Sequence, residues 1–441
     1  MNDAMRLQGE FSVPAEWPAT AVAFRGLALR ACQAMVLLPL FWLILLPEYV
    51  QGLGDPESKS ALYTAGAGPL RLIDMLLLGL VAAHGVVLAS SRTLSVRFPR
   101  ELRLPALGFA GAIGLSMIYG LAHGGTNLFF DWRALALGAG LYVVFSIWVR
   151  TPELAASAIT LFAGFMALRV AAIFVTYAGG SGDVLLGVRI PIFDGPTLSA
   201  TVFTAVMALA MSDAAPGRLP RMLWLGLSAA AYLLVLLCFR RTFWAELGIA
   251  SLFLLFMAKR GRGAKLLLGA TALLVVAAMA GPAFYARLQS MDFSASETEF
   301  SQGNPDHVGE VLDAWEQVKR HPLAGIGLGR SFQTLRIPDW KEESVMVHNA
   351  PLHVWLKYGL TGLACYLWFH AAMFGWLRRK RERQSGASAS GVSHSWLVAA
   401  LAYLPAQFVV SLGFTPWPYS SLQSATLIAF VLAVAATGVP A

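Results

Sequence analysis

Long apolar runs recur along the whole chain and are separated by short polar loops. Most runs hold about 20 residues with few charges, which matches the length that an α-helix needs to cross the hydrocarbon core of a bilayer. We therefore predict about twelve membrane-spanning helices. They cover residues 31–48, 71–90, 104–122, 129–149, 154–177, 197–213, 222–239, 243–258, 264–282, 350–376, 395–413 and 420–438.

The composition agrees with this pattern. Of the 441 residues, 13% are charged and 57% are apolar, and the mean hydropathy is +0.62. A soluble protein of this length could not bury so much apolar surface. We therefore expect an all-α polytopic membrane protein, with residues 1–441 forming a single integral membrane domain.

The positive charges gather in alternate loops. The net charge is +8, with four arginines in 91–103 and five basic residues in 378–383. Because basic residues accumulate in cytoplasmic loops, these loops are predicted to be cytoplasmic. An even number of spans then places both termini on that side. The charge thus reports topology and gives no support to a nucleic acid partner.

One long loop, about residues 283–349, lies between the ninth and tenth predicted spans and is expected on the outer side. We predict an amphipathic helix at 305–320 within it, lying against the membrane domain, because Asn304-Pro305 is typical of a helix start. A structural turn is expected at Gly325-Ile326-Gly327-Leu328-Gly329. The apolar residues at helical spacing are Val308, Val311, Leu312, Trp315 and Val318.

A candidate general base stands where this loop enters the tenth span. His348-Asn349 is followed by Gly359 and Gly362, eleven and fourteen residues after the histidine. An imidazole at a membrane boundary can accept a proton from a substrate held at the lipid surface. A histidine at such a place can also simply solvate a helix end.

Three arginines stand in other outer loops. Arg189 follows the fifth span, and Arg240 and Arg241 occupy the short turn between the seventh and eighth spans. Each can extend its charge to the headgroup layer, but three of them on the face of His348 favour a shared anionic ligand. Guanidinium suits phosphate, because its planar fork donates two parallel hydrogen bonds.

Other charged residues leave alternatives open. Asp74, near the start of the second span, is either a functional membrane acid or a satisfied interfacial one. Glu246, below Arg241, either orients that arginine or neutralises it, and we favour a structural role. The close acid pair outside the membrane is Glu297 and Glu299, and the sequence has no Asp-x-Asp or His-Glu-x-x-His motif. We therefore expect no metal and no other cofactor.

The His348-Asn349 pair with Gly359 and Gly362 resembles the signature of the O-antigen ligases. Their membrane superfamily also holds O-antigen polymerases and bacterial protein O-oligosaccharyltransferases. Trp315 with the segment 321–329 is similar to the family's sequence just before that motif. Arg241-Thr242-Phe243-Trp244 resembles the family's Arg-small-x-Trp segment, and Arg189 stands where the family carries an arginine before a small-residue span.

The chain also departs from its relatives. Relatives often place an arginine one turn before the loop tryptophan, where this chain has Val311. The paired Arg-x10-Gly motifs of many polymerases are absent, since Ala200 and Ser251 stand eleven residues after Arg189 and Arg240. This absence, with the lack of sequence after the last span, favours the ligase.

The resemblance implies a glycosyltransferase of lipopolysaccharide biosynthesis in the bacterial inner membrane. It would transfer a polysaccharide from undecaprenyl diphosphate to a sugar hydroxyl of lipid A–core, on the periplasmic face, by a metal-independent inverting displacement. His348 would be the base and the three arginines would bind the diphosphate. The alternatives are a polymerase or protein O-oligosaccharyltransferase of the same superfamily, and a twelve-span transporter, whose polar residues would lie near the bilayer midplane. The supporting residues would be Asn349, Trp244, Trp315, Gly359 and Gly362.

Overall fold

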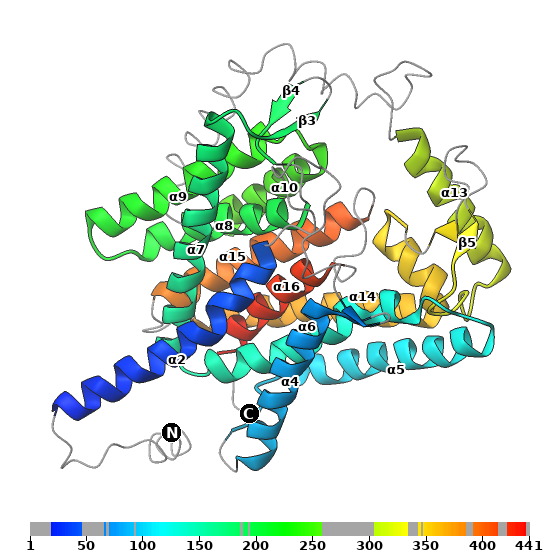
Figure 1. Cartoon of the computed structure of the whole chain (residues 1–441), viewed down its shortest axis with the longest axis horizontal. Helices are drawn as coiled ribbons and strands as arrows, with labels where there is room; N and C mark the ends of the chain where they lie inside the picture. The colour runs from blue at the N-terminus through cyan, green and yellow to red at the C-terminus, as the bar shows by residue number, and fades with distance from the viewer. Residues whose placement is uncertain are drawn as a thin grey trace.

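The protein is an all-α polytopic membrane protein (Figure 1). The computed structural model describes residues 19–45, 66–67, 70–91, 94–185, 188–192, 195–257, 304–333, 343–344, 347–384, 391–412 and 421–437. The helices within them are α2 (Ala19–Leu45), α4 (Leu72–Ser90), α5 (Arg100–Ala122), α6 (Leu128–Trp148), α7 (Pro152–Ala178), α8 (Gly195–Ala214), α9 (Arg218–Leu237), α10 (Arg241–Met257), α13 (Asn304–Arg320), α14 (Ala350–Gln384), α15 (Gly391–Ser411) and α16 (Leu422–Ala436).

Eleven of the twelve predicted spans coincide with these helices, and the ninth, 264–282, lies outside the described residues. Seven helices of the described chain are long and apolar enough to cross a membrane. Among the described residues, three short antiparallel hairpins lie between helices. They are β1 (Gly66–Ala67) with β2 (Leu70–Arg71), β3 (Asp183–Leu185) with β4 (Val188–Ile190), and β5 (Phe332–Gln333) with β6 (Glu343–Ser344).

Helix α8 is the centre of the bundle and packs against α9, α10 and α15. Its small side chains, such as Ser199 and Ala200, let these neighbours approach closely, and almost all of its residues are buried. An aromatic cluster completes the core: the ring centroid of Phe430 lies 4.9 Å from that of Phe41 and 5.3 Å from that of Phe145. Helices α15 and α16 lie in the middle of the view in Figure 1.

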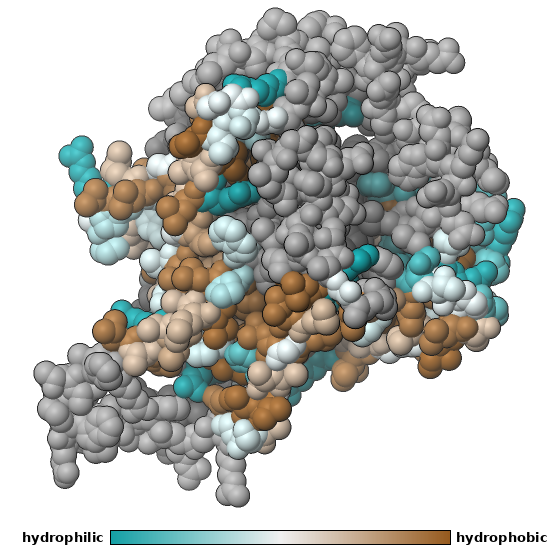
Figure 2. Space-filling model, viewed as in Figure 1, coloured by the Kyte–Doolittle hydropathy of each residue, from teal (hydrophilic) through white to brown (hydrophobic). Residues whose placement is uncertain are grey.

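The outward faces of the peripheral helices are apolar (Figure 2). On α5, for example, four side chains at helical spacing are between 66% and 69% exposed: Leu104, Leu107, Leu115 and Ile118. A stripe of exposed large apolar residues indicates that lipid, rather than water, faces this side of the helix.

If successive helices cross the membrane in alternate directions, α4 and α6 begin on the same side. Polar contacts join helices at positions that this topology places on one side. Asp74, at the start of α4, is fully buried and pairs with Arg133 at the start of α6 over 2.5 Å. Gln33 of α2 donates to the carbonyl of Trp148 at the end of α6 (2.8 Å). Asp74 also accepts from the backbone N–H of Arg71. Asp74 is thus a satisfied acid at a helix start.

The predicted amphipathic loop helix is present as α13, but part of its predicted apolar face was wrong. Leu312 and Trp315 are 45% and 39% exposed, whereas the acids Glu310 and Asp313 are buried together with Ala314. The helix packs on the first turns of α14, where it meets a polar corner. Glu310 faces His348 at that corner, and Leu312 and Trp315 stay outside.

The predicted span 350–376 is not one continuous helix. Gly359 has φ 68° and ψ −174°, so α14 is divided there into an outer segment, 350–358, and a longer second segment. This conformation is accessible to glycine almost alone. A Cβ atom at Gly359 would also clash with the carbonyl oxygen of Leu323, and one at Gly362 with the side chain of Tyr358.

The turn after α13 satisfies the backbone groups that the break in α14 releases. The N–H of Ile326 donates to the carbonyl of Leu356 (2.7 Å), and the N–H of Leu360 donates to the carbonyl of Pro322 (3.0 Å). The hydroxyl of Ser116 on α5 donates to the carbonyl of Lys357 (2.7 Å). Broken helices persist at membrane depth only where such partners exist.

A buried ion pair fixes the same region. The ammonium of Lys357, on α14, lies 2.8 Å from a carboxylate oxygen of Asp131, on α6, and both side chains are nearly inaccessible. The same carboxylate accepts from the N–H of Gly329 (2.8 Å), and Lys357 also donates to the carbonyl of Arg330 (2.5 Å). Since Gly325, Gly327 and Gly329 all have positive φ, the predicted structural turn is confirmed.

We predict that Gly359→Ala lowers the thermal unfolding midpoint of the purified protein. This backbone conformation costs an alanine about 1–3 kcal/mol, and the clash with Leu323 adds to this. The matched control is Gly111→Ala on α5, where a Cβ atom meets open space and alanine favours the helix. Equal midpoints for the two variants would show that the break does not need glycine.

Candidate active site

His348 lies at the corner between the outer loop and the first turn of α14. Its Nδ1 is 2.9 Å from Oε2 of Glu310, and its backbone N–H donates to the same oxygen over 3.2 Å. The side chain of His348 is 26% exposed, while that of Glu310, on α13, is 1% exposed. A buried carboxylate therefore holds an imidazole that still reaches solvent.

One oxygen of Glu310 faces both the backbone and the ring of His348. Oε2 of Glu310 accepts a hydrogen bond from the backbone N–H of His348, and an ionised carboxylate can only accept. With Glu310 ionised, Nδ1 is the donor in the pair and Nε2 is the nitrogen left to take a proton from a substrate. The carboxylate also stabilises the positive charge that the ring gains when it does so.

Asn349 caps α14 and ties the corner to α15. Its Oδ1 accepts from the N–H of Leu352 (2.9 Å), as an N-cap does, and its Nδ2 donates to the carbonyl of Leu412 (2.6 Å). The two bonds set where α14 begins, and therefore where His348 stands relative to α15.

Trp315 contributes to the outer wall of this corner. Its ring meets that of Trp355 edge to face, with the centroids 5.4 Å apart and the planes at 75°. Trp355 in turn donates to the carbonyl of Pro322 (2.9 Å). The pair thus fastens α13 and the following turn to the outer segment of α14, and leaves an apolar face outside.

The arginines occupy a second region, beside the β3–β4 hairpin at the top of Figure 1. The guanidinium of exposed Arg189, on β4, lies over the ring of Tyr177 at 4.7 Å. That of Arg240 lies over Phe243 at 5.5 Å and next to Gly195, where the connection from β4 enters α8. Arg189 therefore lies just before the connection from β4 to α8, and the side chain of Arg240 lies beside the end of that connection.

A strained turn presents Arg240 and Arg241. Phe239 has φ 52°, and among the described residues it is the one non-glycine with positive φ. The side chain of Trp244 packs on Phe239 and donates to the carbonyl of Leu236 (3.2 Å), which holds the turn closed. Strain of this kind, about 1–2 kcal/mol, often occurs at functional sites.

Helix α15 connects the two regions. Its end binds Asn349 through Leu412, and its Tyr403 hydroxyl lies 2.9 Å from that of Ser199 on α8. Ser199 also donates to the buried carboxyl group of Glu246 on α10 (3.0 Å). Glu246 is thus part of a buried hydroxyl network between helices. The structure brings His348, Asn349 and Trp315 together around the start of α14. Arg240 and Arg241 lie with Trp244 at the start of α10, and Arg189 lies on β4 beside Tyr177.

Glu310 was missed as a site residue, because the sequence shows it only as one acid among several in the loop. A usable signal was its spacing, since Glu310, Asp313 and Ala314 share one face of α13. No group of three or more His, Cys, Asp or Glu that could hold a metal occurs in the described ranges. Glu297 and Glu299 lie outside those ranges.

Residues 221–367 match a family model described as O-antigen ligase. The match covers one third of the chain, 147 of 441 residues, and includes Arg240, Arg241, Glu310, His348 and the break in α14. Arg189 precedes it. No curated protein matches the chain. The family match supports membership of this chain in the O-antigen ligase superfamily, whose members are bacterial membrane proteins of ligase and polymerase type.

Proposed function

We propose that this protein is an O-antigen ligase. It transfers a polysaccharide from undecaprenyl diphosphate to a sugar hydroxyl of lipid A–core, on the periplasmic face of the bacterial inner membrane. In this proposal residues 1–441 form one integral membrane domain with both termini in the cytoplasm, and the loop 283–349 covers the site. The observation that carries it is the buried side chain of Glu310 behind the partly exposed imidazole of His348.

The chemistry is a single displacement. Nε2 of His348 takes the proton of the acceptor hydroxyl as its oxygen attacks the anomeric carbon of the donor. The bond from that carbon to the diphosphate oxygen breaks, and its electron pair leaves with the diphosphate. Glu310 stabilises the imidazolium, which then returns its proton to solvent. A positioned base of this kind contributes about 10²–10⁴-fold to the rate.

The leaving group needs no proton, but its developing negative charge needs stabilisation. Arg189, Arg240 and Arg241 supply it in this proposal, because charge-assisted bonds from guanidinium strengthen in a partly desolvated site. Because the anomeric carbon is bonded to the diphosphate, this proposal requires the arginines and Nε2 of His348 to flank the same sugar residue of the donor, on opposite sides of the reacting carbon. Both substrates are anchored in lipid, so they enter from the bilayer.

The test is an in vitro assay with purified protein and three acceptor conditions. Lipid-linked glycan is incubated with lipid A–core, with a peptide acceptor, or alone. We expect glycosylated lipid A–core in the first reaction only. Longer glycan chains on the lipid carrier would instead identify a polymerase, and a glycosylated peptide would identify a protein O-oligosaccharyltransferase. Substrate export without any covalent product would favour a transporter.

We predict that His348→Ala abolishes transfer and that Glu310→Gln lowers the turnover number about 10²–10⁴-fold. The amide keeps the shape of the carboxylate but cannot stabilise the imidazolium. The measurement is turnover of purified protein, with the thermal midpoint as a check on folding. His123→Ala, an exposed histidine at the end of α5, is the control. Near-normal transfer by a folded His348→Ala variant would remove the general-base assignment.

Arg189→Ala and Arg241→Ala should each lower turnover about 10²–10³-fold, as the loss of a transition-state donor does. Lysine should restore little at either position, because ammonium lacks the bidentate fork. Arg240→Ala is measured in parallel, since adjacent residues do not point the same way from a helix start. Arg320→Ala, exposed at the end of α13, is the matched control. Normal activity of the lysine variants would replace specific binding with diffuse electrostatics.

Transfer should survive EDTA with less than about a twofold change in rate, because guanidinium groups can stabilise the diphosphate without a divalent cation. The assay compares purified protein with and without chelator, and then with added Mg²⁺. A reaction that stops with EDTA and resumes with Mg²⁺ would overturn the arginine mechanism in favour of metal-assisted departure of the diphosphate.

A further inference from the structure

Exposed apolar residues form a stripe along the second segment of α14. Leu360, Leu367 and Trp368 recur at helical spacing and are between 42% and 45% exposed. A Cβ atom at Gly108 on α5 would lie 3.6 Å from the ring of Trp368, so this stripe adjoins the lipid-facing side of α5. Lipid therefore faces this side of α14 as well.

The apolar surface does not end where α14 breaks. The carbonyl of Pro322 accepts from the N–H of Leu360 (3.0 Å) and from Nε1 of Trp355 (2.9 Å). Leu323, the next residue, is 71% exposed. The ring of Trp355 then meets that of Trp315, with the centroids 5.4 Å apart. These contacts continue the stripe onto α13, and we call the resulting set the outer apolar surface: Leu312, Trp315, Leu323, Trp355 and Leu360.

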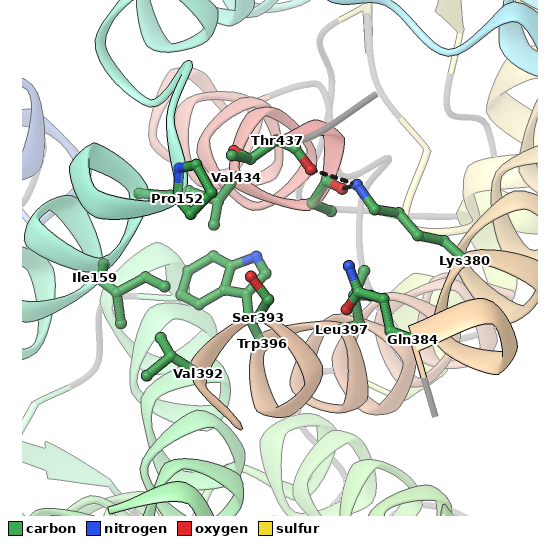
Figure 3. Close-up of a pocket in the computed structure, with 13 residues that line it drawn as sticks. Pro152, Ile159, Lys380, Gln384, Val392, Ser393, Trp396, Leu397, Val434 and Thr437 are labelled. Atoms are coloured by element: carbon green, nitrogen blue, oxygen red, sulfur yellow. Dashed lines mark hydrogen bonds between the residues drawn. The ribbon is translucent and has the colours of Figure 1, made fainter. Parts of the chain in front are cut away.

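The other end of α14, in contrast, is covered by protein. Lys380 donates to the carbonyls of Ala435 and Thr437 (Figure 3). Ile159 and Trp396, which line the pocket beside it, are 3% and 1% exposed. Helix ends of this bundle can thus be closed by the chain itself, whereas the outer apolar surface stays open.

The side chains and the direction of α13 suit a membrane interface. Glu316 and Lys319 follow Leu312 by four and seven residues, so they share its side of the helix. They form an ion pair over 2.7 Å and are 41% and 50% exposed. The axis of α13 runs across that of α5 in Figure 1. A helix that lies along a membrane surface meets both lipid and water, which suits a side with apolar and charged residues.

We propose that the outer apolar surface is docked in the headgroup layer of the outer leaflet, with lipid as its partner. Leu323 and Leu360 lie deepest, next to the stripe of α14. The rings of Trp315 and Trp355 lie among the headgroups, where indole has both apolar and polar neighbours.

This docking sets the height of the candidate base. Glu310 lies on the opposite, buried side of α13 and faces His348. Lipid on one side of α13 therefore holds the pair on the other side at the level of the headgroups. The docking needs no assumption about which acceptor the protein uses.

The test is spin-label EPR of the full-length protein in vesicles of phosphatidylethanolamine and phosphatidylglycerol. The accessible native cysteines are removed by Cys32→Ala and Cys365→Ala, while Cys238 is buried and stays. A nitroxide is attached to Leu312→Cys or to Leu323→Cys. Its collision rate with oxygen, which concentrates in the bilayer, is divided by its collision rate with a water-soluble nickel chelate.

Two further labels give the references. Leu107→Cys, on the lipid-facing side of α5, represents the membrane, and Ser181→Cys, exposed just before β3, represents water. We expect the oxygen-to-nickel ratio at Leu312→Cys and Leu323→Cys to be severalfold higher than at Ser181→Cys. It should stay below the ratio at Leu107→Cys, because an interface is shallower than the hydrocarbon core.

A ratio equal to that at Ser181→Cys would place α13 in water and would overturn the proposal. Low collision rates with both reagents would mean that protein covers the surface, as a second copy of the chain would, and would overturn it too. Size-exclusion chromatography shows which variants fold. If one of the two labelled positions does not tolerate cysteine, the other decides.

Discussion

The break in α14 at Gly359 is the constraint on which the outer face depends. A helix that stops and restarts at membrane depth exposes carbonyl and N–H groups, and each of them costs several kcal/mol if it stays unsatisfied. The turn after α13 supplies partners for Leu356 and Leu360, and the Lys357–Asp131 pair locks that turn in place. Because the turn must dock there, α13 is held across the outer segment of α14. That position brings Glu310 to His348.

Two buried acids, Asp131 on α6 and Glu310 on α13, have different tasks toward partners at or near the start of α14. Asp131 neutralises Lys357, collects the N–H of Gly329, and serves the fold. Glu310 faces a side chain that is 26% exposed, so its partner can exchange protons with a substrate or with solvent. A closed network of the first kind gives rigidity, whereas a network with one exposed member can do acid–base chemistry.

The sequence predicts the helices well, because long apolar runs in a membrane protein have few other interpretations. It predicts less where tertiary contacts decide. The apolar pattern continues through Gly359, so hydropathy alone does not predict the helix break. The tertiary contact between Gly359 and Leu323 decides it. The Asp131–Lys357 pair joins residues 226 positions apart, and no local pattern predicts it. His348 and the arginines became candidates because their charges stand in unusual places. Glu310 did not, because acids are common in an outer loop.

The central claim is that the Glu310–His348 pair activates an acceptor hydroxyl for one direct displacement at the anomeric carbon. The most direct measurement is the configuration of the new glycosidic bond, determined by NMR on the product of purified protein. It is compared with the configuration of the sugar–phosphate bond in the donor. Inversion is the predicted result. Retention would contradict the account, because a single back-side displacement at the anomeric carbon inverts its configuration.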